Sequence, residues 1–297
     1  MKIAILGPIA PGEKKFWQKT AKSMGHSLDW IEMRSVMIKV DKNKGVNITA
    51  LVCEKDKRRT VNMKSYDCIL RRWIKKYYVQ SLILCSLLQK EGKIVINSKI
   101  DRIQDKITQA FKLSVAGLPH PTTYQVLRPK RLREVLDKIK YPAILKQIEG
   151  ALGAQVYLIN SRTAAVKILN KYKMYNVLIQ EYFPVKEDFR VFVVGEKVLG
   201  AMKRMATHGE FRNNVAQGAF TEKAELTQEL KEIALRAARV LEYEIAGVDI
   251  IYYKGKPYIL EVNRTPQFRG FTETMGINVA KEIIKYLESL YLKARPK

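Results

Sequence analysis

Two carboxylates and one carboxamide lie where a hairpin of two strands would bring them together. Asp249 lies in a strand-like run at 245–253, and Glu261 and Asn263 come at the end of a second run at 256–262, after a Lys-Gly turn. Because side chains alternate between the faces of a strand, Glu261 and Asn263 point the same way, beside Asp249. Such oxygen ligands suit Mg²⁺ or Mn²⁺. The pattern predicts a metal site, although the spacing alone slightly favours a hairpin with a polar, solvated end.

Two further segments carry residue types that suit a nucleotide. Lys146 ends a short apolar run and precedes a loop of small residues at 147–154, so its charge and the loop N–H groups could meet phosphate oxygens. The apolar run at 177–182 ends in polar groups, where backbone atoms could hold adenine and Glu181 could accept from a ribose hydroxyl. Each segment has an ordinary alternative, a hairpin turn or an edge strand that enters a loop. Neither the Gly-x-x-x-x-Gly-Lys-Ser/Thr loop nor Gly-x-Gly-x-x-Gly occurs.

In their order along the chain, these segments resemble the motifs of the ATP-grasp ligases. They more closely resemble those of the RimK-like (ribosomal-S6 modification) family, which adds amino acids to carboxylates. The resemblance runs from about residue 100 to about residue 290. It rests on these segments: Asp105-Lys106, Ile144-Leu145-Lys146, Gln180-Glu181-Tyr182, Asp188-Phe189-Arg190, Gly209-Glu210-Phe211-Arg212-Asn213-Asn214, Ala246-Gly247-Val248-Asp249-Ile250, Glu261-Val262-Asn263 and the tail 272–280. The seven motifs before the tail, all in register, are specific, and they favour an enzyme.

The resemblance implies an α/β ATP-grasp fold, with an N-terminal parallel-sheet (pre-ATP-grasp) domain and two α+β lobes enclosing ATP. The expected domains are residues 1–100, a central lobe at 101–182, and a C-terminal lobe with the metal site at 183–297. The sequence pattern itself predicts an alternation of strands and helices in the first domain. Strands are expected at 2–6, 27–31, 47–52, 68–71 and 94–97, and helices at 13–24, 79–89, 105–116, 131–139, 163–172, 227–241 and 278–291.

The implied reaction has two steps. An acceptor carboxylate attacks the γ-phosphorus of ATP to give an acyl phosphate and ADP, and the amine of an amino acid, glutamate being favoured, then displaces phosphate. Positioning and charge neutralisation suffice, without a side-chain nucleophile. The resemblance assigns two Mg²⁺ (or Mn²⁺) ions to Asp249, Glu261 and Asn263. It assigns nucleotide contacts to Lys106, Lys146, Gln180, Glu181, Tyr182, Asp188, Arg212 and Asn213, and catalytic contacts to Arg204, Arg212 and Asn214.

The formal net charge of +25 is the second large feature of the chain. ATP needs only a few cations, so the surplus points to a polyanionic acceptor: an acidic protein tail, a phosphate-bearing cofactor or nucleic acid. Arg264 and Arg269 follow the metal motif where the family often has Ala-Ser-Pro-Gly, which also suggests an acidic acceptor. Basic runs lie at Lys55, Lys57, Arg58 and Arg59; Arg71, Arg72, Lys75 and Lys76; and Lys130, Arg131 and Arg133. The aromatics beside Arg71, Arg72, Lys75 and Lys76 keep single-stranded nucleic acid as the less favoured partner.

Composition excludes several other classes. With 297 residues, 47% of them hydrophobic, the chain can bury a sizeable core in about two domains. No apolar segment reaches the roughly 20 residues that span a bilayer, and residues 1–8 predict a first strand and its turn, with no signal peptide. Cys53, Cys68 and Cys85 are scattered, without metal-ligand spacing, as in a reducing, cytoplasmic protein.

Two alternatives stay open. One is a nucleic-acid-binding module that kept the fold without ligase activity, although a pure binder has no use for clustered carboxylates. The other is a ligase of the same fold that acts on a lysine- or arginine-biosynthesis carrier protein with an acidic tail. A homo-oligomer is compatible with either.

Overall fold

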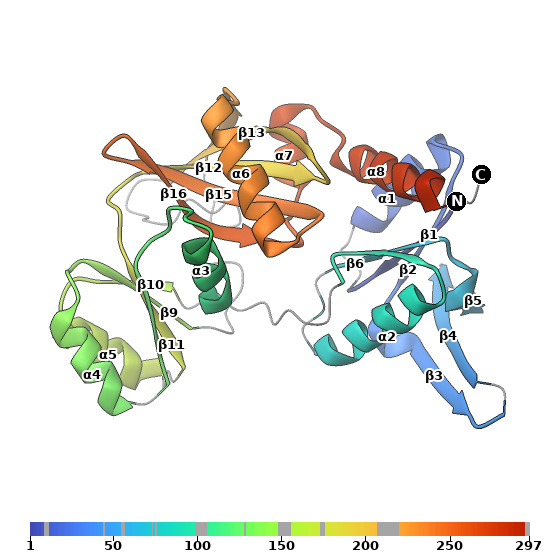
Figure 1. The fold of residues 1–297 in the computed structure, drawn as a ribbon, viewed down its shortest axis with the longest axis horizontal. Coiled ribbons are helices and arrows are strands. Elements are labelled where there is room, and N and C mark those ends of the chain that lie inside the picture. The colour runs from blue at the N-terminus through green and yellow to red at the C-terminus, as the bar shows by residue number, and fades with distance from the viewer. Residues whose placement is uncertain are drawn as a thin grey trace. The chain divides into compact units, whose positions relative to one another are not determined.

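The fold is that of a computed structural model, which describes residues 1–8, 12–43, 45–54, 57–72, 74, 76–98, 106–127, 129–147, 156–172, 176–206 and 220–294. Its contacts divide the chain into two compact units (Figure 1). Unit 1 comprises Met1–Arg102 and Asn278–Lys297, and unit 2 comprises Ile103–Ile277. The three domains proposed from the sequence, with boundaries near residues 100 and 182, stay a prediction.

A parallel sheet forms the centre of unit 1, as predicted. Its order is β2-β1-β6-β7, with β1 at Lys2–Leu6, β2 at Ser27–Ile31, β6 at Cys68–Arg71 and β7 at Ile94–Ile96. Strands buried on both faces read as continuous apolar runs, which is why β1 and β6 were readable from the sequence. The helices of this unit are α1 at Glu13–Ser23, α2 at Tyr78–Lys90 and α8 at Val279–Ala294. The C-terminal helix α8 is tied to the segment before β2 by a hydrogen bond of 2.7 Å between His26 Nε2 and Glu288 Oε1.

A second, antiparallel sheet of order β3-β4-β5 packs on the first. Its strands are β3 at Val36–Asp41, β4 at Gly45–Glu54 and β5 at Lys57–Asn62, with short 3₁₀ turns at Met33–Ser35 and Met63–Ser65 on either side. Ile48, Ala50 and Val52 of β4 are buried in one core with Ala4 and Leu6 of β1. Only the middle strand was predicted, because β3 and β5 are largely exposed.

Unit 2 contains two antiparallel sheets. The first has the order β10-β9-β11-β8, with β8 at Thr123–Val126, β9 at Ala143–Gln147, β10 at Val156–Ile159 and β11 at Val177–Glu181. Helices α4 at Pro129–Lys138 and α5 at Arg162–Tyr172 pack on it through Leu136 and Leu169. Helix α3 at Lys106–Val115 opens the unit.

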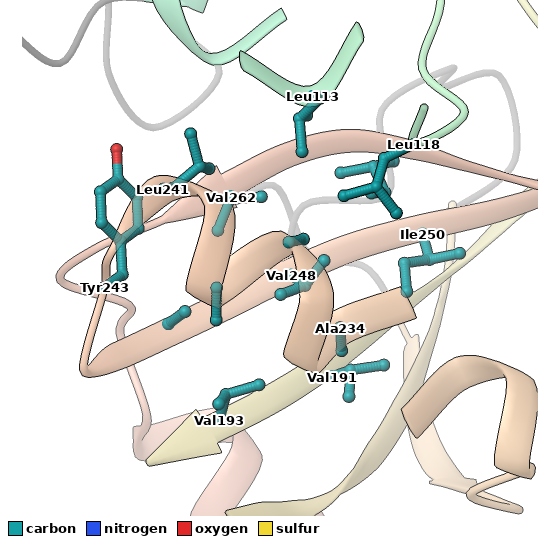
Figure 2. Packing of buried hydrophobic residues seen from close by; sticks show 14 of the residues in the cluster. Leu113, Leu118, Val191, Val193, Ala234, Leu241, Tyr243, Val248, Ile250 and Val262 are labelled. Carbon is teal, nitrogen blue, oxygen red and sulfur yellow. The ribbon is translucent and has the colours of Figure 1, made fainter. Parts of the chain in front are cut away.

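The second sheet of unit 2 carries most of the predicted site. Its order is β14-β13-β12-β15-β16, with β12 at Glu187–Val194, β13 at Lys197–Met205, β14 at Phe220–Ala224, β15 at Ile245–Tyr253 and β16 at Lys256–Asn263. Helix α6, Gln228–Leu241, packs its alanines on the valines of β12 and β15 (Figure 2). The predicted cap Thr227 accepts a hydrogen bond from the Leu230 N–H, 3.2 Å away, and α7 at Arg269–Met275 follows the sheet. Within the described ranges, no helix meets the length and apolarity that a membrane crossing requires.

Candidate active site

Strands β15 and β16 form the predicted hairpin. Its turn uses Lys254 and Gly255, both with positive φ, 51° and 74°. Asp249 lies directly opposite Glu261, with an irregularity in the pairing just after Asp249. The Asn263 side chain also reaches Asp249, since its Nδ2 donates to Asp249 Oδ2 at 3.3 Å. The structure therefore brings together the three residues predicted as metal ligands.

Two arginines also contact Asp249, and neither contact is predicted from the sequence. Arg190 of β12 lies directly opposite Asp249 and donates to both carboxylate oxygens through Nε and Nη2. Arg204 of β13 donates to Asp249 Oδ1 at 3.1 Å. Arg204 also forms a bidentate pair with Asp188, at 2.6 and 2.9 Å. Asp188, Arg204 and Asp249 are all buried, so this is an ion-pair network in the interior of the sheet.

The network shifts the pKa values of its two carboxyl groups in opposite directions. Burial raises the pKa of Asp188 to about 6, despite the guanidinium of Arg204, and the charge of Asp249 adds to the effect. Burial also opposes ionisation of Asp249, but Arg190 and Arg204 together hold its pKa below the ordinary value. Asp249 is therefore the carboxyl group of the network that ionises at the lower pH.

The residue types at Asp249, Glu261 and Asn263 fit Mg²⁺, which prefers carboxylate and amide oxygens. Yet the donors from Arg190, Arg204 and Asn263 already occupy both oxygens of Asp249. Since a carboxylate offers about four lone-pair positions, a cation at Asp249 must replace at least one of these donors. Across the described part of the chain, no group of three or more His, Cys, Asp and Glu side chains could hold a metal ion. Here the third ligand would be the amide of Asn263.

A buried lysine lies within electrostatic reach of this hairpin. Lys146 of β9 donates to Gln180 Oε1 of β11 at 2.8 Å, and Gln180 in turn donates to Thr123 Oγ1 at 3.0 Å. Burial lowers the pKa of Lys146 to about 8; the negative charge of Glu261 opposes that shift and the positive charge of Lys106 adds to it. Two predicted phosphate contacts and one predicted metal ligand thus form one electrostatic cluster. A polyanion there would favour the charged form of Lys146.

The structure describes some of the other residues that were predicted to contact the nucleotide or the transferred phosphate, and leaves others outside the described ranges. Glu181 lies exposed at the end of β11 and accepts from the Thr122 N–H at 3.2 Å, and Tyr182 follows it. Asp188, expected near adenosine, is held by Arg204, and an adenosine contact there stays a prediction. Arg212, Asn213 and Asn214, together with residues 148–155 of the small-residue loop, lie outside the described residues.

Sequence reasoning gave no role to Arg190 or Gly247. The signal for Arg190 was the Asp-x-Arg spacing at 188–190, because two residues apart on a strand share one face. Gly247 leaves room for it: a Cβ at Gly247 would lie 3.0 Å from Arg190 Cδ and 2.8 Å from Pro266 Cβ. Such approaches are too close without movement of the neighbours, so a glycine is required where Arg190 crosses β15.

Comparison with solved structures identifies the class of fold. The ATP-grasp ligase PsnB, complexed with a phosphomimetic variant of its minimal precursor, Mg and ADP, matches with a TM-score of 0.75 at 16% identity, over 97% of this chain and 98% of that one. A RimK domain protein from Sphaerobacter thermophilus matches with a TM-score of 0.67 at 18% identity, over 97% and 100%. D-alanine–D-alanine ligase from Bacillus anthracis matches with a TM-score of 0.66 at 18% identity, over 99% and 98%. The predicted ATP-grasp fold is confirmed.

Sequence comparison then defines the family. A model described as a RimK-like ATP-grasp domain matches residues 87–287. A probable alpha-L-glutamate ligase of Haemophilus influenzae is 30% identical over 280 residues, 91% of each chain, and one of Legionella pneumophila is 35% identical over 216 residues, 70% of each. The chain belongs to the RimK-like ATP-grasp family. The predicted class of enzyme, an ADP-forming ATP-dependent carboxylate–amine ligase, is confirmed with it.

Proposed function

We propose that this enzyme joins glutamate to a carboxylate of an acidic acceptor at the expense of ATP. One observation carries the proposal: Lys146 lies within electrostatic reach of both Lys106 and Glu261, and Glu261 is on the hairpin that holds Asp249 and Asn263. This is the combination of cations and oxygen ligands that a polyphosphate with a divalent metal requires. The choice of glutamate is supported by the probable alpha-L-glutamate ligases at 30% and 35% identity.

In this proposal the chain's own residues bind and orient the reactants. Lys106 and Lys146 contact the phosphates of ATP, while Gln180 fixes the Lys146 ammonium. The nucleoside lies against the end of β11, where Glu181 is exposed. Arg204, Arg212 and Asn214 stabilise the transferred phosphoryl group and the acyl phosphate.

The metal site of the proposal uses Asp249, Glu261 and Asn263, and one or two Mg²⁺ ions there would neutralise charge on the β- and γ-phosphates. The structure of PsnB with Mg and ADP supports this choice of ion by relation of fold. Arg190 and Arg204 donate hydrogen bonds to Asp249, so binding of a metal ion there would require one of these arginines to give up its contact with a carboxylate oxygen.

The acceptor of the proposal is an acidic polypeptide segment. The net charge of +25 and the two arginines after the metal motif support it. Related ligases of this fold are known in complex with peptides: PsnB with a minimal precursor, and the macrocyclase MdnC with precursor peptide MdnA. A cytoplasmic setting agrees with the three free cysteines.

The nucleic-acid alternative loses part of its support. Arg71 and Arg72, from the run of alternating cations and aromatics, are buried, with exposed fractions of 1% and 9%. Arg71 Nε donates to Ser81 Oγ at 2.8 Å, and its guanidinium lies 4.7 Å from the centre of the Tyr78 ring. Both arginines are therefore structural groups of unit 1, and a surface stripe for single strands would need other cations.

The test is ADP release by the purified protein with a panel of amino acids and acidic peptides, followed by mass spectrometry of the peptides. The proposal expects ADP to form with glutamate and the peptide mass to rise by one glutamyl residue. Glutamine, which differs from glutamate by one charge, is the matched control substrate. ADP release that needs nucleic acid, or that is equal for every amino acid, would contradict the proposal.

A further inference from the structure

Strand β3 forms one edge of the antiparallel sheet of unit 1. It pairs with β4 on one side, and among the described residues no strand pairs with its other side (Figure 1). Its apolar side chains are unusually exposed, since Met37 has 61% and Val40 has 76% of its surface accessible. An edge strand presents a row of backbone N–H and C=O groups to any strand that approaches it. Exposed apolar groups along that row make β3 a site for strand addition.

The two edges of this sheet are protected differently. The opposite edge, β5, carries Arg58 and Arg59; although Arg59 pairs with Asp29 at 2.5 Å, closely spaced like charges oppose the approach of an identical strand. On β3 the one cation is Lys39, and its ammonium lies 3.7 Å from Asp41 on the same strand. The β3 edge is thus close to neutral where the β5 edge is charged.

The apolar residues of β3 lie on the face that continues the core. Val36, Ile38 and Val40 lie opposite Ala50, Ile48 and Val46 of β4. Ile48 and Ala50 are buried, whereas Ile38 and Val40 are exposed by 38% and 76% although they share that face. The apolar layer therefore continues to the edge of the sheet, where it remains accessible to solvent.

Three apolar residues are placed symmetrically along β3, with Val36 and Val40 two positions on either side of Ile38. A two-fold axis at Ile38 would set Val36 of one copy against Val40 of the partner subunit and the two Ile38 side chains against each other. Within β3, Met37 would then lie opposite Lys39 of the partner subunit on the outer face, with no like charges directly opposed, and only beyond the strand ends would Arg34 face Lys42 of the partner subunit. We propose that two copies of this chain associate through antiparallel pairing of their β3 strands, centred on Ile38, into one continuous six-stranded sheet.

Charge decides between a second copy and an acidic peptide at this edge. Of the nearby cations, Arg34 and Lys39 have carboxylate neighbours, Glu32 at 2.7 Å and Asp41 at 3.7 Å, and the exposed Lys42 follows the strand. A self-complementary apolar strand fits a nearly neutral edge better than an acidic segment does. Since each chain carries a net charge of +25, repulsion opposes the dimer, and salt should strengthen it by screening.

Sedimentation velocity of the full chain over a range of concentration and salt tests the pairing. The wild type should dimerise, more tightly as salt rises. Val40→Lys places a cation in the paired edge of both copies and should raise the dissociation constant on the order of 100-fold. Leu51→Lys is the matched control, because Leu51 is also an exposed apolar residue but lies on the central strand β4, and its dimer should be unchanged.

A crosslink tests the register. In a Cys53→Ser background, which removes the exposed native thiol, Ile38→Cys should form an intersubunit disulfide on mild oxidation, whereas Thr49→Cys on β4 should not. A wild type that stays monomeric, a dimer that tolerates Val40→Lys, or equal crosslinking at both positions overturns the proposal. So does a Val40→Lys variant that loses acceptor turnover at an unchanged oligomeric state, because the edge would then take the acceptor strand.

Discussion

Arg190 and Asp249 lie directly opposite each other on β12 and β15 and form a bidentate ion pair. Asp249 also accepts from Arg204, so one carboxylate is shared by two guanidinium groups in the interior of a sheet. Removing one partner of such a network leaves the others buried and only partly compensated. The pair also decides which lone pairs of Asp249 are accessible to a cation. With Asp249 as the proposed metal ligand, stability and metal binding are therefore coupled at this position.

Arg190→Gln should separate the two effects. Because Arg204 still contacts Asp249, we expect a loss of about 1–3 kcal/mol in the free energy of unfolding, measured by urea denaturation. Mn²⁺ should bind more tightly to the variant without nucleotide, because two donors have left Asp249; calorimetry measures this. Arg239→Gln, which removes an exposed pair with Glu196, should change neither quantity appreciably. Unchanged Mn²⁺ affinity in a folded Arg190→Gln protein would argue against Asp249 as a ligand.

Gly247→Ala tests the space that Arg190 needs. The added methyl group would lie 2.8 Å from Pro266 Cβ and 3.0 Å from Arg190 Cδ, so one of these groups must move. Overpacking of this kind costs about 1–3 kcal/mol. In the Arg190→Ala background the cost should be smaller, because one obstacle is gone, and a double-mutant cycle of unfolding free energies measures the difference. Strictly additive losses of unfolding free energy would mean that the methyl group added at Gly247 is opposed by Pro266 alone.

The sequence predicted most elements that follow a simple pattern. The apolar strands β1, β6 and β11, the amphipathic helix α6 and its Thr227 cap, and the turn at Lys254 and Gly255 all have local signals. The metal hairpin could be predicted for the same reason, since strand alternation alone sets Glu261 and Asn263 on one face. These features depend on residues close together in the chain.

The missed elements depend on partners that are distant in sequence. Strand β12 carries Asp188 and Arg190 in a buried setting, where charged residues normally indicate a loop. Their cost is offset by Arg204 and Asp249, which lie 16 and 59 residues away from their partners. Strand β3 was missed for another reason, because it is largely exposed and the apolar Met37 interrupts the alternation of Val36, Ile38 and Val40 with polar residues.

Lys146→Ala should weaken ATP more than adenosine, because the ammonium is proposed to meet phosphate. The pKa of Lys146 near 8 adds a pH dependence: ATP affinity should fall as pH rises through about 8, when the group loses its charge. Calorimetric titrations with both ligands at several pH values measure this. Lys146→Arg keeps its charge and should show a flatter profile. Equal losses for ATP and adenosine in Lys146→Ala would mean that the lysine supports the sheet and does not touch phosphate.

The same group predicts a dependence of stability on pH. The pKa of Lys146 is lower in the folded protein than its ordinary value of 10.5, so the unfolded chain binds more protons between about pH 8 and 10.5. The contribution of this residue to stability therefore rises with pH across that window. Lys146→Met removes the titrating group. The free energy of unfolding of the wild type, measured by urea denaturation relative to this variant, should therefore rise from pH 8 to pH 10.5.

Glu261→Gln keeps the size of the side chain and removes its charge. We expect turnover to fall on the order of 100-fold or more, the scale seen when a preorganised electrostatic contact is lost, with the fold retained. The Lys146 pKa should fall further, since Glu261 opposes its depression. ADP release measures turnover, and Glu196→Gln on an exposed turn is the control. Near-normal ADP production by the purified variant would remove Glu261 from the metal site.

Arg269→Glu tests the proposal of an acidic acceptor. Arg269 opens α7, six residues beyond the end of β16, and its exposed side chain pairs with Glu273 at 2.8 Å. Reversing its charge should raise the KM for an acidic peptide and leave ATP binding almost unchanged. The wild-type KM for that peptide should also rise with salt, because attraction is screened beyond a Debye length of about 10 Å at 0.1 M, while the KM for glutamate changes little.

Arg239→Glu is the control for this reversal. Arg239 is also exposed and paired, but it lies on α6, outside the segment after β16 that is proposed to contact the acceptor. Its KM for the peptide should stay near that of the wild type. If both reversals raise KM alike, the overall charge of the protein attracts the acceptor and Arg269 has no special part. If neither does and the wild-type KM is insensitive to salt, the acceptor is not recognised by its charge, and the excess of 54 basic over 29 acidic residues serves another partner.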